Sequence, residues 1–177
     1  MTEIFIIGSE KDHTLENLIR NSLSMTYRII YVKENEFYVS GSGYELICFD
    51  CPCPKICGTE NAIVIAKKSA SVPSSLPDDC TAIINADDLS QTEAAENSGI
   101  YVIDCGLSHT STVSFSSENE DTVMISLNRS VRALSGKVIQ PLEIPVKRNR
   151  ADIYTLMSFT ALRLLLDDFE SDLGSLI

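Results

Sequence analysis

Residues 4–19, with the sequence IFIIGSEKDHTLENLI, decide the fold class. The apolar run Ile4–Ile7 predicts a buried strand, and apolar residues at helical spacing from Leu15 onwards predict a helix. Between them lies the turn Gly8-Ser9-Glu10-Lys11-Asp12-His13-Thr14. A strand, a glycine turn and a helix in this order form the frame of a nucleotide-binding loop, in which backbone N–H groups and a lysine meet phosphate. This turn has one glycine, and Asp12 stands where the lysine is expected.

The turn has two interpretations. In the first, the backbone amides of residues 8–14 and the helix N-terminus bind a phosphate or another anion. In the second, which we favour, the turn only connects strand to helix and Asp12 caps the helix. A capping aspartate occupies amides that an anion would need, and its charge repels a triphosphate. We therefore expect no tight binding of ATP with Mg²⁺.

The remaining sequence predicts a single α/β domain over residues 1–177. Strand signals rich in Ile, Val, Tyr and Phe occupy Arg28–Lys33 and Glu36–Ser40, and short apolar runs occupy Tyr44–Asp50, Ala62–Ala66, Thr81–Asn85 and Tyr101–Cys105. Continuous apolar runs suit strands of a parallel sheet covered on both faces, so we expect Ile4–Ile7, Ala62–Ala66, Thr81–Asn85 and Tyr101–Cys105 in the parallel part. A polar helix is expected over Ser90–Asn97, so helices flank the parallel part.

The pattern changes after Gly106, where apolar residues alternate with polar ones and predict antiparallel strands with one solvated face. The mixed sheet should therefore have an antiparallel C-terminal part. We expect one strand over Val138–Val146, in which Pro141 and Pro145 would project to the same face. Because proline cannot donate a hydrogen bond to a neighbouring strand, this strand should lie at a sheet edge or contain a bulge. A largely buried helix, capped by Asp152, should close the chain.

Composition narrows the function classes. The formal net charge is −11, from 14 Lys and Arg against 25 Asp and Glu, which argues against binding to nucleic acid or an anionic membrane. We find no secretory signal and no apolar run long enough to span a bilayer, and we expect a cytoplasmic protein. Its six cysteines should then be reduced.

Two further motifs contain side chains that could bind a ligand or a metal ion. Asn85, Asp87 and Asp88 follow an expected parallel strand, where open α/β sheets bind ligands and carboxylates can hold Mg²⁺. We favour the simpler interpretation of a turn and helix cap.

The second motif is a thiol cluster within ten residues that could bind Zn²⁺ or an iron–sulfur centre, formed by Cys48, Cys51, Cys53 and Cys57. No second ligand pair stands at zinc-ribbon spacing, so we expect these thiols to be metal-free and Cys48 to pack as an apolar residue.

The order of these motifs resembles the central, ATP-binding domain of the Mur ligase family. That domain opens with a strand and a Gly-Thr-x-Gly-Lys-Thr-type loop, whose counterpart here is residues 8–14. The family then shows Asn-x-Asp-Asp at a strand end, as in Asn85–Asp88, and a Gly-Leu-like turn, as in Gly106-Leu107. Antiparallel strands and an apolar helix follow. The resemblance implies an ATP site formed by the turn and by the Asn85–Asp88 segment.

The departures from the family pattern change the expected function. Lys11 replaces the second loop glycine, Asp12 replaces the lysine, and the Mg²⁺-binding segments have no clear counterpart. Our leading hypothesis is a stand-alone, degenerate relative that serves as a binding or assembly module without a cofactor. One alternative is an ATP-dependent amide ligase or nucleotide hydrolase acting with a partner chain, and another is a cysteine-cluster metal protein. We also expect self-association or a protein partner, through side chains rather than strand pairing.

Overall fold

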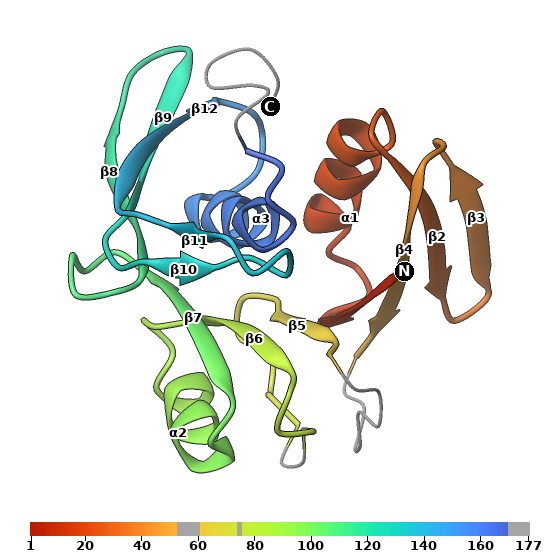
Figure 1. The fold of residues 1–177 in the computed structure, drawn as a ribbon, viewed down its shortest axis with the longest axis horizontal. Coiled ribbons are helices and arrows are strands. Elements are labelled where there is room, and N and C mark those ends of the chain that lie inside the picture. Colours follow the sequence, from red (N-terminus) through yellow and green to blue (C-terminus); the bar gives the residue numbers. More distant parts are fainter. Residues whose placement is uncertain (53–60, 74–75, 170–177) are drawn as a thin grey trace.

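The computed structural model describes residues 1–52, 61–73 and 76–169 (Figure 1). A ten-stranded mixed sheet runs through them in the order β12-β9-β8-β7-β6-β5-β1-β4-β2-β3. The strands are β1 (Thr2–Ile7), β2 (Tyr27–Lys33), β3 (Glu36–Ser40), β4 (Tyr44–Cys51), β5 (Ile63–Ala66), β6 (Thr81–Asn85), β7 (Tyr101–Gly106), β8 (Val113–Glu118), β9 (Thr122–Leu127) and β12 (Leu142–Lys147).

The centre of the sheet is parallel, from β2 through β4, β1, β5, β6 and β7 to β8. This confirms the predicted α/β class and the parallel part expected at Ile4–Ile7, Ala62–Ala66, Thr81–Asn85 and Tyr101–Cys105. Strands β8, β9 and β12 pair antiparallel at one end, as the alternating pattern predicted. At the other end β3 pairs antiparallel with β2. A two-residue connection between β2 and β3 permits only this hairpin.

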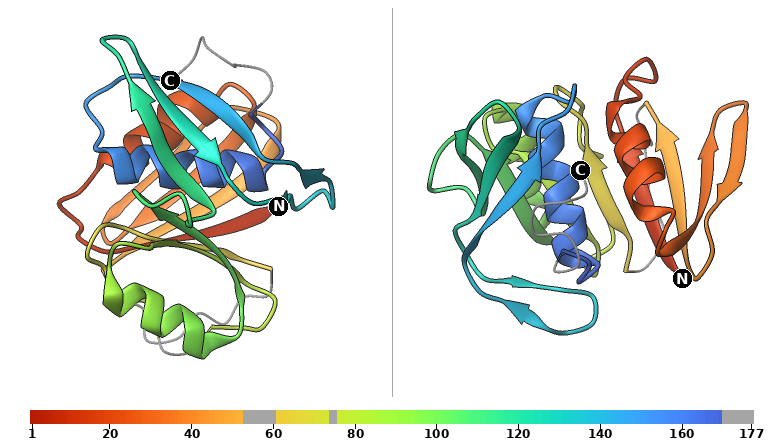
Figure 2. Two further views of the ribbon diagram at one scale, coloured as in Figure 1. Left: turned by 90° about the vertical axis from the view of Figure 1, so that its left-hand side faces the viewer. Right: turned by 90° about the horizontal axis from the view of Figure 1, so that it is seen from above.

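Helices lie on both faces of the sheet (Figures 1 and 2). One face carries α1 (Thr14–Leu18), which continues as the π-helical turn η1 (Ile19–Leu23), and α3 (Ile153–Leu165). The other face carries α2 (Leu89–Ser98), which packs through Ala95 against Ala82 and Ile84 of β6. Among the described residues, no helix is long and apolar enough to cross a membrane.

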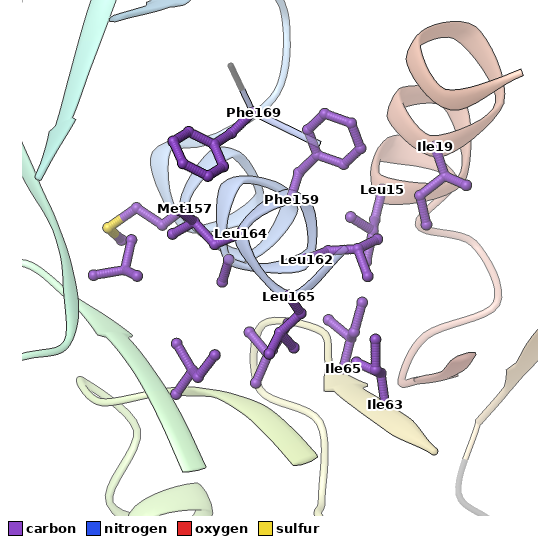
Figure 3. Packing of buried hydrophobic residues seen from close by; sticks show 14 of the residues in the cluster. Leu15, Ile19, Ile63, Ile65, Met157, Phe159, Leu162, Leu164, Leu165 and Phe169 are labelled. Carbon is purple, nitrogen blue, oxygen red and sulfur yellow. The ribbon is translucent and has the colours of Figure 1, made fainter. Parts of the chain in front are cut away.

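Helix α3 forms the centre of the main core (Figure 3). Asp152 begins it as predicted, because its carboxylate accepts hydrogen bonds from the backbone N–H groups of Tyr154 and Thr155. Every residue from Tyr154 to Leu165 is buried, as expected for a helix whose surface is apolar on most sides and that packs against other elements all round. Its Tyr154 hydroxyl donates to the carbonyl of Ala66 at 2.7 Å and fixes the helix to the end of β5.

The segment Val138–Val146 does not form the one strand that we predicted. It divides at Gln140-Pro141 into β11 (Val138–Ile139), which pairs with β10 (Val131–Arg132), and β12, which pairs with β9. Before the break the odd-numbered Ile139 is buried and Val138 is exposed, whereas in β12 the even-numbered apolar residues face the core. Pro141 has no N–H to continue a ladder, which explains the interruption. Strand β12 does lie at a sheet edge, as its prolines predicted.

Candidate functional site

The loop between β1 and α1 lies at the carboxyl ends of three neighbouring strands. The backbone N–H of Gly8 donates to the carbonyl of Cys51 at the end of β4, at 3.1 Å. The N–H of Lys67, just after β5, donates to the carbonyl of Ile7 at 2.7 Å. Gly8 has a φ of +138°, and a Cβ there would lie 2.7 Å from the Cβ of Lys67. A glycine is therefore required both by the backbone conformation and by the close approach of Lys67.

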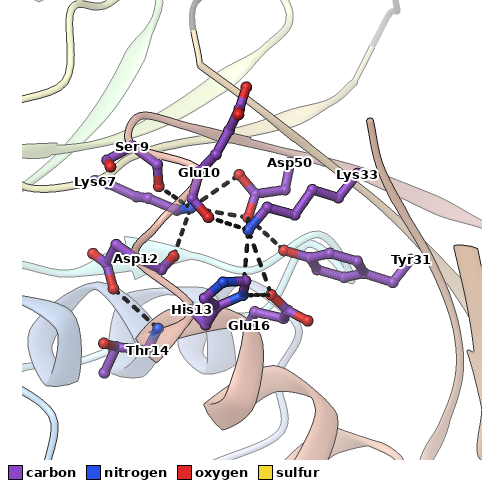
Figure 4. Close-up of polar contacts among 10 residues, drawn as sticks. All are labelled: Ser9, Glu10, Asp12, His13, Thr14, Glu16, Tyr31, Lys33, Asp50 and Lys67. Atoms are coloured by element: carbon purple, nitrogen blue, oxygen red, sulfur yellow. Dashed lines mark hydrogen bonds and ion pairs between the residues drawn. The ribbon is translucent and has the colours of Figure 1, made fainter. Parts of the chain in front are cut away.

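The side chain of Lys67 enters this loop from the neighbouring strand (Figure 4). Its Nζ donates to the carbonyl oxygens of Ser9 at 3.0 Å and Asp12 at 2.9 Å. The same Nζ lies 2.9 Å from both carboxylate oxygens of Asp50. Only 2% of the Lys67 side chain is exposed, and Asp50 is fully buried. A buried ammonium group held by four oxygen atoms thus fills the interior of the loop.

A second lysine, Lys33 at the end of β2, reaches the same loop from the other side (Figure 4). Its Nζ donates to the carbonyl of Glu10 at 2.6 Å and lies 3.3 Å from Nδ1 of His13. It also lies 3.6 Å from the Asp50 carboxylate and 3.7 Å from that of Glu16. The side chains of Lys33 and Glu16 are almost fully buried. His13, half-exposed, lies 2.8 Å from Glu16 at the surface of the group.

Tyr31 completes what we call the buried polar cluster, which consists of Glu16, Tyr31, Lys33, Asp50 and Lys67. The Tyr31 hydroxyl donates to Asp50 at 2.5 Å. Burial raises the pKa of Tyr31 far above its ordinary value, and the hydrogen bond to Asp50 and the nearby carboxylate charges raise it further. Tyr31 therefore stays a neutral donor. Two ammonium groups face two carboxylates, so the cluster can be neutral overall, which burial of charges requires.

The loop directs backbone carbonyl oxygens, rather than N–H groups, toward the lysine side chains. Three loop carbonyls, those of Ser9, Glu10 and Asp12, accept hydrogen bonds from lysines. An anion-binding loop instead directs backbone N–H groups at its ligand. In this arrangement the loop encloses cations that belong to the chain itself.

Asp12 lies just before α1, one residue ahead of the N-cap residue His13. Its carboxylate accepts a hydrogen bond at 3.0 Å from the N–H of Thr14, the first residue of the helix. Burial alone would raise the Asp12 pKa, but the Thr14 hydrogen bonds and the charges of Lys67 and His13 lower it below its ordinary value. Asp12 is therefore ionised at neutral pH. The neighbouring Lys11 is exposed, unlike the two lysines of the buried polar cluster.

The Asn85–Asp88 segment lies at the same edge of the sheet, after β6. The Asn85 side chain accepts from the N–H of Asp87, and Asp87 accepts from the N–H of Leu107 at 3.0 Å. Asp88 caps α2 by accepting from the N–H and hydroxyl of Ser90. Gln91 joins this segment to the loop region, since it contacts both Asn85 and the backbone carbonyl of Lys67. The polar groups of the segment therefore serve as a turn and a cap.

The structure describes two of the four cysteines of the thiol cluster, Cys48 and Cys51. Cys48 is fully buried within the core, as predicted, and burial together with Asp50 raises the pKa of its thiol to about 12. Cys51 is half-buried at the end of β4, whereas Cys53 and Cys57 lie outside the described residues. Among the residues that are described, no group of three or more His, Cys, Asp or Glu side chains could hold a metal ion.

Sequence analysis missed the residues that dominate this site: Lys33, Asp50 and Lys67. Each stands at the carboxyl end of a predicted strand or directly after it, and parallel strands bring those ends to one edge of the sheet. That position was the available signal. It could not by itself show that β2, β4, β1 and β5 are adjacent in this order.

Comparison with solved structures identifies the fold. The structure of a UDP-N-acetylmuramoyl-L-alanyl-D-glutamate–2,6-diaminopimelate ligase matches 99% of this chain, with a TM-score of 0.59 and 12% sequence identity. A murein peptide ligase from Psychrobacter arcticus matches 98%, with a TM-score of 0.56 and 9% identity. The chain covers 45% and 46% of those ligases, respectively, so it spans less than half of their length. No family model and no curated protein matches the sequence. The fold is therefore Mur ligase-like, as the order of motifs indicated.

Proposed function

We propose that this chain is a non-catalytic binding or assembly module with a Mur ligase-like fold and a degenerate phosphate loop. The observation that carries the proposal is the occupation of the loop interior by the ammonium group of Lys67. In a working phosphate loop, phosphate oxygens would occupy this interior and meet backbone N–H groups. Here carbonyl oxygens surround it and Asp50 neutralises the cation.

Nucleotide binding in this loop would require three unfavourable changes. Lys67 would have to leave Asp50, which would strand a fully buried carboxylate. The carbonyls of Ser9 and Asp12 would lose their donor. The ionised Asp12 side chain would then face a triphosphate of the same sign. These costs add to one another, and they support a structural role for the loop.

Calorimetric titration with ATP and Mg²⁺ tests this proposal. We expect no saturable binding at micromolar nucleotide, whereas a dissociation constant in the low micromolar range would refute the degenerate loop. If heat were observed, the Lys67→Met variant would locate the site, because binding at the loop would change with this substitution. Lys68→Met is the matched control, since Lys68 is the next residue and is exposed.

One observation favours the alternative of an ATP-dependent ligase or hydrolase that acts with a partner chain. The sequence lacks a lysine within the loop at the expected position, yet Lys67 and Lys33 place two ammonium groups at the loop. A partner that supplied a cation to Asp50 could release Lys67 toward a phosphate. Titration of the isolated chain and of a complex purified from its source would separate the two candidates. The cysteine-cluster alternative is tested by zinc and iron analysis, where one metal ion per chain would support it.

A further inference from the structure

Strand β3 ends the ten-stranded sheet, and beyond Glu36 at its start it carries no charged residue or proline that would protect the edge. Among the described residues it pairs with β2 alone. Its sequence, EFYVS, contains no proline, glycine or lysine. The opposite edge strand, β12, contains Pro145 and ends at Lys147. Natural proteins generally block exposed edges by such residues, because an open edge pairs with another strand.

One side of β3 is apolar and exposed. Phe37 is 68% exposed and Val39 is 45% exposed, and they project to the same face of the sheet because they are two residues apart. They lie beside the half-buried Val32 and Ile30 of β2. The ribbon shows α1 on one face of this part of the sheet and no described helix on the other (Figure 2). Tyr38 contacts Arg20 of η1 on the covered face, so its neighbour Phe37 projects to the uncovered face. An apolar stripe thus runs along an open edge.

The other side of β3 is anchored in the protein. The ring of Tyr38 stacks on that of Tyr31, with centroids 4.9 Å apart, and the guanidinium of Arg20 lies 5.0 Å from its centroid. The strand is therefore held in an extended conformation before any partner arrives. Such preorganisation lowers the entropy lost when a second strand pairs with it.

We propose that β3 pairs antiparallel with β3 of a second copy of this chain, around a two-fold axis at Tyr38, in place of the side-chain contact expected from the sequence. In that register Phe37 stands opposite Val39 of the second copy, and the symmetry repeats the pair. Glu36 stands opposite Ser40. A two-fold interface must be self-complementary in this way. This inference deepens the proposed function, on which it rests, by naming the partner of the assembly module.

Charge and hydrogen bonding both favour this register. The chain carries a net charge of −11, so two copies repel at long range, but within this register Glu36 meets no acidic residue. The hydroxyl of Ser40 is buried and has no hydrogen-bond partner within the described residues. The pairing brings the carboxylate of Glu36 from the second copy beside Ser40, and a χ1 rotation of Ser40 would turn its hydroxyl outward to donate to that carboxylate. A buried hydroxyl without a partner is otherwise unfavourable.

Sedimentation equilibrium of the full chain tests the pairing. We expect a reversible monomer–dimer equilibrium that strengthens with added salt, because salt screens repulsion between the acidic chains. Phe37→Glu and Val39→Lys should each weaken the dimer about tenfold or more, since symmetry removes two apolar pairs at once. Leu89→Glu is the control, because Leu89 is an exposed apolar residue on α2, away from β3.

Mixing the two variants tests the register itself. A mixed dimer places the introduced glutamate of one chain opposite the introduced lysine of the other and keeps one Phe37–Val39 pair, so affinity should recover about tenfold. A wild-type monomer at high micromolar concentration would overturn the proposal, as would a dimer insensitive to Phe37→Glu or a mixture without recovery. Circular dichroism confirms that each variant folds. A monomer that does not bind ATP overturns the pairing alone, whereas a dimer that binds ATP with Mg²⁺ overturns only the degenerate loop.

Discussion

Replacing Lys67 with methionine should destabilise the protein strongly, although the substitution lies in a loop. Methionine retains the length of the side chain and removes the ammonium group that contacts Ser9, Asp12 and Asp50. Removing one partner of a buried ion pair costs ~3–5 kcal/mol. Tyr31 and Lys33 still contact Asp50, so we expect the lower end of that range, about 3 kcal/mol.

Urea unfolding measures this loss as a difference in the free energy of unfolding between variant and wild type. Lys68→Met should change the free energy by less than ~0.5 kcal/mol, as exposed substitutions usually do. Asp50→Asn should also destabilise. The double variant should lose less than the sum of the two single losses, by about 1–3 kcal/mol, because the pair is in direct contact. A loss below ~1 kcal/mol for Lys67→Met, or strict additivity, would refute the idea that this pair organises the loop.

The other predictions concern the loop and the sheet edge. Asp12→Asn should lower stability at neutral pH, because the Asp12 pKa is lowered from its ordinary 3.8 and its carboxylate therefore stabilises the folded state above that pH. The difference from wild type should shrink as pH falls below about 4, and a constant difference in urea unfolding across pH 3–7 would contradict this. Gly8→Ala should lower the free energy of unfolding by about 1–3 kcal/mol in the same assay, because alanine is strained at a φ of +138° and its Cβ meets Lys67. An unchanged free energy of unfolding would show that the close approach is relaxed in solution. Phe37→Glu should weaken self-association, and its melting temperature should match that of the wild type only at concentrations where both are monomeric, since Phe37 is largely exposed within one chain.

The fold could be predicted from the sequence where local patterns and tertiary structure agree. Continuous apolar runs, such as Thr81–Asn85, identify parallel strands because both faces are buried. Asp152 marks the start of α3 because a cap depends on only three neighbouring residues. The prediction was wrong at Val138–Val146, where side-chain parity alone suggested one strand. The strand breaks because Pro141 has no backbone N–H and because Val138–Ile139 pairs with β10 instead. The alternation of apolar and polar side chains reveals neither of these causes.

The site was harder to predict because its key contacts are between distant parts of the chain. Lys33, Asp50 and Lys67 come from three strands and meet only because β4 and β5 flank β1 while β2 lies beside β4. A lysine after an apolar run normally indicates a solvated strand end. Burial of Lys67 follows from the glycine at position 8, which allows β5 to approach the loop closely. Strand order and this close approach are global properties that one sequence does not reveal.

A crystal structure grown with millimolar ATP and Mg²⁺ tests the central claim most directly, because it shows what occupies the loop of residues 8–14. We predict that the ammonium group of Lys67 remains there, bonded to Ser9, Asp12 and Asp50, with no nucleotide within the loop. A triphosphate in the loop, contacted by the backbone N–H groups of residues 8–14 and with Lys67 displaced from Asp50, would contradict the account.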